Sequence, residues 1–204
     1  MRNFIIGLLL TLVGIMGLML LPSKQEPAAM PWEVTVMGDG NSKVLGIHLG
    51  TTTFRQAQLM LHAYGKTAVF IQENETPTVE AFFESINLGG LSAKIVLNMS
   101  LDQRQVELML ERATEARLQP SGAHRYDLNP QDHASLLDTP ISALTYIPSI
   151  KLNKARIEHR FGKPDQIKPD PESPDTTIWQ YTAIGLNIRI NPTERSVLQY
   201  RSSH

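Results

Sequence analysis

Cysteine does not occur anywhere in this 204-residue sequence. Without it the chain has no disulfide framework, no thiolate nucleophile and no cysteine-ligated metal site. The chain also lacks the acylated cysteine on which bacterial lipoproteins carry their lipid. Any attachment to a membrane must therefore come from the polypeptide itself.

A strong charge of either sign is missing too. The chain carries 19 Lys and Arg against 20 Asp and Glu, which gives a formal net charge of −1. Proteins that bind nucleic acid normally show a basic face, so this balance predicts no nucleic-acid partner. Hydrophobic residues at 42% and charged residues at 19% are instead typical of a folded, globular chain.

Catalytic motifs are also absent. The sequence contains no Walker loop, no GxGxxG and no GxSxG nucleophile elbow. None of the six histidines stands in HExxH or another close metal-ligand spacing: His48, His62, His124, His133, His159 and His204. We therefore predict no enzyme, no cofactor and no metal. A periplasmic hydrolase with a dispersed site of His, Asp and Ser, to be tested at His124, His133 and Asp132, stays open because triads assemble across a fold.

One long apolar run does occur, at Phe4–Leu21. Its 18 residues carry no charge, and at ~1.5 Å each they give about 27 Å of helix, enough to cross a hydrocarbon core. A cleaved signal needs small residues three and one positions before the cut, and Leu21 or Pro27 would occupy the first of these. We predict that residues 1–22 form an uncleaved membrane anchor, with cleavage as the alternative.

Flanking charges predict the orientation of this anchor. Arg2 and the α-amine precede the run, whereas Lys24 after it is offset by Glu26. The positive-inside rule then keeps the N-terminus in the cytoplasm and exports the rest of the chain. We expect a bacterial inner-membrane protein that crosses once through residues 4–21, with its C-terminal part in the periplasm. The proline-rich residues 23–31 form a short, semi-extended spacer.

After the spacer, the pattern of apolar residues and turns predicts an α+β fold. It divides into two small helix-plus-antiparallel-sheet modules, residues 32–118 and 119–204. The first module begins with a β-hairpin around a turn at 38–41. A helix follows, opened by a Thr53–Gln56 capping box and closed by Gly65. Three strands come next, at residues 67–72, 78–86 and 91–97.

A long second helix is predicted to run from a Ser100–Gln103 capping box to Arg117. In the second module a strand at 123–128 precedes a short helix, which runs from Asn129 as its cap to Asp138. Another strand is expected at 141–147.

The last helix is predicted between an Asn153 cap and Gly162. Residues 162–174, GKPDQIKPDPESP, are rich in proline and charge and predict an irregular loop outside the core. The final strands are expected at residues 177–182, 185–190 and 196–200.

The two modules share a short sequence match. Tyr64-Gly65-Lys66 aligns with Phe161-Gly162-Lys163, and each triplet ends a predicted helix that precedes about three strands. Because the order of elements repeats along with the residues, the match suggests a tandem repeat.

A family resemblance appears in the second module. Leu152, Ile157 and Phe161-Gly162, followed by Pro164, Trp179 and Tyr181, resemble the SmpA/OmlA pattern. That family includes the small lipoprotein subunit of the outer-membrane β-barrel assembly machine. Its fold is shared with β-lactamase inhibitor proteins, which carry it in tandem. The resemblance implies two short helices on a three-stranded antiparallel sheet over residues 147–200. The exported part as a whole also looks similar to uncharacterised envelope proteins of Gram-negative bacteria.

Four residues are candidates for a contact surface. Trp179 and Tyr181 occupy alternate positions, so they share one face of a strand, either in the core or on a binding face. Lys163 and Asp165 lie in the neighbouring loop. We therefore predict a membrane-tethered, non-catalytic protein-interaction module that contacts another envelope protein through exposed sheet and the proline-rich loop. A carrier of a small apolar ligand is a further alternative.

Overall fold

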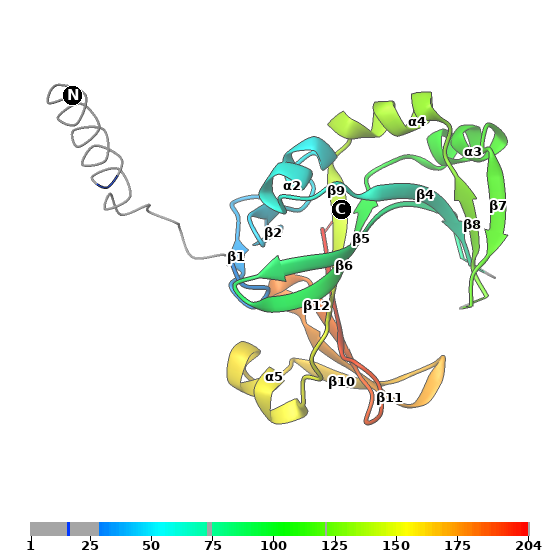
Figure 1. Ribbon diagram of the computed structural model, residues 1–204. Coiled ribbons are helices and arrows are strands. Elements are labelled where there is room, and N and C mark those ends of the chain that lie inside the picture. Colours follow the sequence, from blue (N-terminus) through cyan, green and yellow to red (C-terminus); the bar gives the residue numbers. More distant parts are fainter. Residues whose placement is uncertain (1–15, 17–28, 73–74, 121, 204) are drawn as a thin grey trace, which may run out of the picture.

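The computed structural model describes residues 16, 29–72, 75–120 and 122–203 of the chain. Ten strands form one antiparallel sheet, and three short strands form a second sheet. Figure 1 shows the large sheet bent into an open curve, with the helices along its outer side. The predicted anchor and most of the spacer lie outside the described residues, apart from Met16 and residues 29–31. No helix among the described residues is long and apolar enough to cross a membrane.

The small sheet contains the predicted hairpin. Its strands are β1 (Thr35–Val36), β2 (Ser42–Val44) and β3 (Ile47–His48). In the turn between β1 and β2, the Asp39 carboxylate accepts a 3.0 Å hydrogen bond from the backbone N–H of Asn41 and lies 3.0 Å from Nε2 of His48. These contacts, the backbone hydrogen bond above all, lower the pKa of Asp39 to about 2. The hairpin predicted around residues 38–41 is confirmed.

The next elements are α2 (Phe54–Met60), β4 (Lys66–Ile71), β5 (Thr78–Leu88) and β6 (Leu91–Met99). The Thr53–Gln56 capping box and the three strands are confirmed. The predicted Gly65 cap is wrong, because α2 ends at Met60 and His62 takes the left-handed conformation, with φ of 49°. Gly65 is needed for close packing instead. A Cβ there would lie 2.7 Å from Cζ of Phe83, which is 2% exposed.

Then come α3 (Gln103–Glu111), β7 (Glu115–Leu118), β8 (His124–Asp127), α4 (Pro130–Ser135) and the 3-10 helix η1 (Leu136–Asp138). The helix predicted from Ser100 to Arg117 is wrong at both ends. Asp102 is the N-cap and forms its capping box with Gln105. The C-terminal part of the predicted helix is strand β7, whose backbone pairs with β8. The Asn129 cap is confirmed.

The second half holds β9 (Ile141–Pro148), α5 (Lys154–Phe161), β10 (Gln166–Asp170), β11 (Ser173–Tyr181), the 3-10 helix η2 (Thr182–Ile184), β12 (Leu186–Ile190) and β13 (Val197–Arg201). The Asn153 cap and the Gly162 end of α5 are confirmed. The loop predicted at 162–174 is wrong, because β10 lies within it and pairs with β11. Pro169 is tolerated there because β10 is an edge strand. Residues 147–200 thus hold the end of β9, one α-helix, the 3-10 helix η2 and four further strands, where the resemblance implies two short helices and three strands.

The predicted fold class, α+β with two separate helix-plus-sheet modules in tandem, is wrong. The chain is mostly antiparallel sheet, in the strand order β10-β11-β12-β13-β9-β6-β5-β4-β8-β7. Strand β9 pairs with β6 on one side and with β13 on the other, so it joins both halves into one sheet. The structure does not support the predicted tandem repeat either, because the two aligned aromatic residues have different surroundings. Tyr64 is 92% exposed, whereas the Phe161 ring packs 5.7 Å from the ring of Tyr181.

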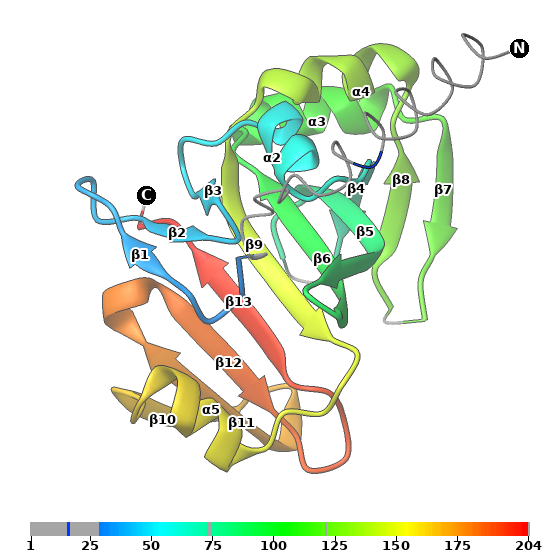
Figure 2. The same ribbon diagram turned by 60° about the vertical axis from the view of Figure 1, so that its left-hand side comes forward.

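The core lies against the outer face of the sheet. Helices α2, α3 and α5 bury their apolar residues there, and Figure 2 shows α5 lying across β10 and β11. The buried residues of both halves of the sheet belong to one continuous cluster. The largest fully buried side chains from the large sheet are Phe83, Ile95, Leu97, Ile141, Leu144, Tyr146 and Tyr200. One face of the sheet is therefore covered and forms the core, while none of the described helices covers the opposite face.

Candidate functional site

The uncovered, inner face of the sheet is the candidate functional surface. In Figure 1 none of the described helices lies on the inner side of the curve. Cross-strand partners on this face form one row through eight strands: Lys66, Phe82, Val96, Thr145, Gln199, Asn187, Gln180 and Gln166. All eight are partly or fully exposed. We call this set the inner row.

Strand alternation places the inner row opposite the core. Val96 stands between Ile95 and Leu97, and both of these neighbours are 0% exposed. Thr145 stands in the same way between the buried Leu144 and Tyr146. Since successive side chains of a strand point to opposite faces, the buried neighbours face the core and the row faces outward from it.

The inner row changes character along its length. Next to Lys66 at its β4 end, the row is apolar at Phe82 and Val96, and the Lys94 ammonium lies 5.8 Å from the ring centroid of Phe82. From β13 to β10 it consists of amides, and Nε2 of Gln180 donates a 3.3 Å hydrogen bond to Oδ1 of Asn187. Amide groups both donate and accept hydrogen bonds. The face therefore offers apolar contact at one end and hydrogen bonding at the other.

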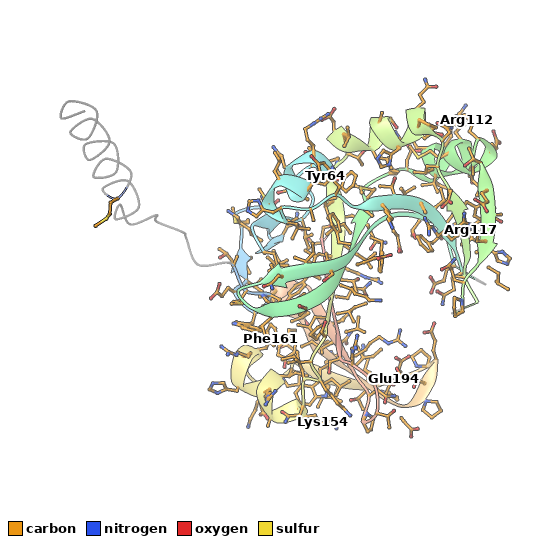
Figure 3. All side chains as sticks on the ribbon, viewed as in Figure 1. Tyr64, Arg112, Arg117, Lys154, Phe161 and Glu194 are labelled. Carbon is orange, nitrogen blue, oxygen red and sulfur yellow. The ribbon has the colours of Figure 1, made fainter. Side chains whose placement is uncertain are left out.

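Several arginines on the inner face are paired with carboxylates. On β7 and β8, Arg117 lies 2.6 Å from Glu115, and Arg125 lies 2.8 Å from Asp127. The Arg117 guanidinium lowers the pKa of the Glu115 carboxyl through this contact. Near the other end, Arg189 reaches Asp170 at 2.6 Å and Glu172 at 3.3 Å. Figure 3 shows Arg117 on one arm of the curve and Glu194 on the other.

The Glu80 carboxylate differs from these paired groups because it accepts hydrogen bonds from neutral side chains. It lies on the inner face of β5, opposite Asn98, whose Nδ2 donates a 3.2 Å hydrogen bond to the carboxylate. The hydroxyl of Thr78 donates a second bond of 3.2 Å, and burial raises the pKa of Glu80 above its ordinary value. Ionised Glu80 therefore costs free energy in the folded state. Perturbed carboxyl groups of this kind cluster at functional surfaces.

The residues predicted as a contact surface are not brought together on one face. Trp179 and Tyr181 are 6% and 5% exposed and belong to the core, so the binding-face interpretation is wrong for them. The Tyr181 hydroxyl donates a 3.0 Å hydrogen bond to the Gly162 carbonyl, and burial raises its pKa to about 12. Lys163 and Asp165 are exposed in the connection between α5 and β10.

The residues named for a hydrolase site make separate contacts. The Asp132 carboxylate is 5% exposed and lies 2.6 Å from the Arg112 guanidinium. Nδ1 of His133 lies 2.6 Å from the hydroxyl of Thr67. His124 lies on β8, with its ring 6.5 Å from that of Tyr126. Among the described residues, no group of three or more His, Asp or Glu is arranged to hold a metal ion.

A cavity of about 520 Å³ adjoins the amide end of the inner row and is lined in part by Gln166, Gln180 and Asn187. Two other cavities lie away from the row. One of about 730 Å³ adjoins α2 and α4 and is lined in part by His62, Tyr64 and His133. Another of about 470 Å³ lies beside α5 and is lined in part by Trp32 and Arg160. Both are open to solvent at the surface of the molecule.

The inner row itself was missed in the sequence. The sequence does contain a signal for it, because polar residues such as Thr145 and Gln199 alternate with apolar residues in β9 and β13. The sequence does not show that these two strands pair with each other. Comparisons with protein-family models, with curated proteins and with solved structures found no match for this chain.

Proposed function

We propose that this chain is a non-catalytic, membrane-tethered protein of the bacterial envelope that binds another envelope protein through the inner face of its sheet. The observation that carries the proposal is the inner row, which runs uncovered through eight paired strands. The apolar run Phe4–Leu21 supports a tether in the inner membrane with the sheet in the periplasm. The SmpA/OmlA-like pattern supports the same class of function.

The size of the inner face favours a protein partner over a small ligand. Eight strands spaced by ~4.8 Å give a row of about 34 Å. A stable protein interface buries roughly 800 Å² on each side. A patch of that area is roughly 30 Å across, which is close to the length of the row. Small-molecule sites instead enclose most of their ligand in a concave pocket. The inner row extends well beyond the cavity beside its amide end, and this extent supports recognition of a folded surface.

Composition and charge support the same conclusion. Protein interfaces are enriched in aromatic residues and arginine, and this face carries Phe82, Arg117 and Arg189. Both arginines are paired with carboxylates of the same face, which weakens their attraction for a strongly charged ligand. We expect recognition by shape, apolar contact and amide hydrogen bonds, and weak dependence on salt.

Photo-crosslinking in membranes of the cells that make the protein tests this proposal. A photoreactive amino acid replaces Thr145 in the middle of the inner row, and in a matched chain it replaces Arg104, which is exposed on α3. We expect one adduct of fixed stoichiometry from position 145 and none of that mass from position 104. The adduct is expected to disappear when Val96→Arg places a charge beside position 145.

A folding control accompanies the Val96→Arg variant. Its thermal unfolding should match that of the unmodified chain, because Val96 is partly exposed on the uncovered face. Identical adducts from positions 145 and 104, or an adduct that survives Val96→Arg in a folded protein, would contradict the proposed inner-face interface.

A further inference from the structure

Positive charge is concentrated around α5. Residues 151–163 contain one acidic residue, Glu158, and five basic ones: Lys151, Lys154, Arg156, Arg160 and Lys163. This segment therefore has a formal charge of +4. Since the whole chain has a net charge of −1, all other residues together carry −5. The charge distribution is strongly polarised even though the total is close to neutral.

These five cations lack anionic partners among the described residues, since none of them takes part in an ion pair there. The Lys151 ammonium contacts the Pro192 carbonyl, and the Arg160 guanidinium lies 4.4 Å from the ring centroid of Trp32. Arg156 and Arg160 stand four residues apart on one helix face, where like charges repel. An external anion at this face would relieve that repulsion.

An apolar cavity adjoins the cations. Its volume is about 470 Å³, and its apolar lining residues are Trp32, Leu91, Ile150, Leu152, Ile157 and Phe161. Arg156 and Arg160 line the same cavity, and Ile150 remains 45% exposed. Apolar surface bordered by arginines fits an amphipathic anion, with its phosphate on the guanidinium groups and its hydrocarbon in the cavity.

The position of Trp32 connects this surface with the predicted anchor. Ten residues separate Leu21 from Trp32, and even fully extended they span at most about 35 Å. The domain is held at that point, because the buried Tyr200 hydroxyl donates a hydrogen bond to the Pro31 carbonyl. A chain anchored through residues 4–21 therefore keeps the α5 surface close to the bilayer, where tryptophan is favoured.

We propose that the α5 surface, formed by α5, Trp32 and Ile150, docks on the anionic phospholipid of the membrane that holds the tether. This inference rests on the tether in the proposed function. Each cation near an anionic bilayer contributes to binding, and the apolar cavity adds contact with the acyl region. Because α5 lies on the outer side of the sheet, docking leaves the inner face free for its protein partner.

The absence of cysteine allows a direct test with the full chain. Ala155 lines the cavity and is exposed, so Ala155→Cys gives a single site for a fluorescent label; Ala134→Cys, exposed on α4, is the matched control. The labelled chains are reconstituted in vesicles of phosphatidylcholine alone or with phosphatidylglycerol. Lipids brominated along their acyl chains report contact by quenching. We expect quenching at position 155 only with phosphatidylglycerol, lost at high salt, and none at position 134.

Arginine variants sharpen this test. Arg156→Gln with Arg160→Gln should lower the ratio of docked to undocked protein roughly 25-fold, about fivefold for each cation. Arg104→Gln with Lys43→Gln removes the same charge at two exposed positions elsewhere and should leave quenching at position 155 unchanged. Equal losses in the two double variants would overturn the proposal. Quenching of the same size with both lipids would also overturn it. A label at position 155 that stays in water would do the same, and is the result expected if an acidic protein occupied this surface.

Failure of this inference is distinguishable from failure of the proposed function. Flotation of the full chain with phosphatidylcholine vesicles reports the tether alone, and crosslinking from position 145 reports the inner face alone. A chain that floats and crosslinks but shows no quenching at position 155 would contradict only the docking of α5.

Discussion

Phe82 and Phe83 are neighbours in β5 but lie on opposite faces of the sheet. The Phe83 ring is 2% exposed and meets Phe54 of α2 edge to face, with ring centroids 6.5 Å apart. Phe82 is partly exposed in the inner row beside Lys94. The same residue type thus stabilises the fold on one face and stays available for contact on the other. Burial, and not residue type, separates the two roles.

The basic residues show a similar contrast between the inner face and the α5 surface. Arg117 and Arg189 are neutralised by carboxylates within 2.6 Å. Arg156 and Arg160 form no ion pair within the described residues, although one acidic residue, Glu158, stands between them in sequence. A neutralised surface suits a partner recognised by shape, whereas unpaired cations suit an anionic one. The two surfaces are therefore suited to partners of different chemistry.

The largest expected effect separates the two faces of β5. Phe83→Ala should lower the free energy of unfolding by about 3–5 kcal/mol, because it leaves a cavity beneath α2. Phe82→Ala should cost under about 1 kcal/mol, because its ring is partly in water. Chemical denaturation of both variants measures the difference. Equal losses would break the distinction between a covered and an uncovered face.

A smaller effect tests how tightly the outer face is packed against α2. Gly65→Ala places a Cβ 2.7 Å from the Phe83 ring and should destabilise the fold by about 1–3 kcal/mol through overpacking. A Cβ added at Gly38 would meet no described atom within 4 Å beyond its chain neighbours, so Gly38→Ala should change stability by less than about 0.5 kcal/mol. Denaturation midpoints report both values. A neutral Gly65→Ala variant would show that the core beneath α2 can relax.

The smallest effect concerns Glu80 on the inner face. Because burial raises the folded-state pKa of Glu80, its ionisation disfavours folding as pH rises through that value. Glu80→Gln should therefore raise the melting temperature slightly at pH 7. Below the ordinary pKa of 4.5, where the carboxyl is protonated in both states, the difference should vanish. Melting curves across pH measure this. A gain that persists at low pH would assign the effect to packing instead of charge.

Sequence patterns predicted the local elements well where a few adjacent residues determine them. The Thr53–Gln56 capping box, the Asn129 and Asn153 caps and the turn at 38–41 are all formed. The errors arose where distant pairing overrides local preference. Residues 115–118 continue a helical pattern but pair with β8, and the proline-rich segment becomes edge strand β10 because β11 supplies its hydrogen bonds.

The candidate site could be predicted from the sequence less completely than the local elements. Trp179 and Tyr181 share one face of β11, as alternation predicts, but alternation alone does not say which face is covered. Helix α5 covers that face, which buries both residues. The polar residues on the opposite face, such as Gln180, form the surface instead. Their alignment with Asn187 and Gln199 follows from strand register.

The sequence by itself determined the N-caps at Thr53, Asn129 and Asn153, the turn at 38–41, most strands and the polarised charge around α5, because each depends on side chains a few residues apart. Only the tertiary structure decided that β9 joins β6 to β13 in a single ten-stranded sheet. Strand order and register depend on hydrogen bonds and side-chain packing between segments far apart in the chain. Those long-range contacts created the covered core and the open inner face from the same alternating strands.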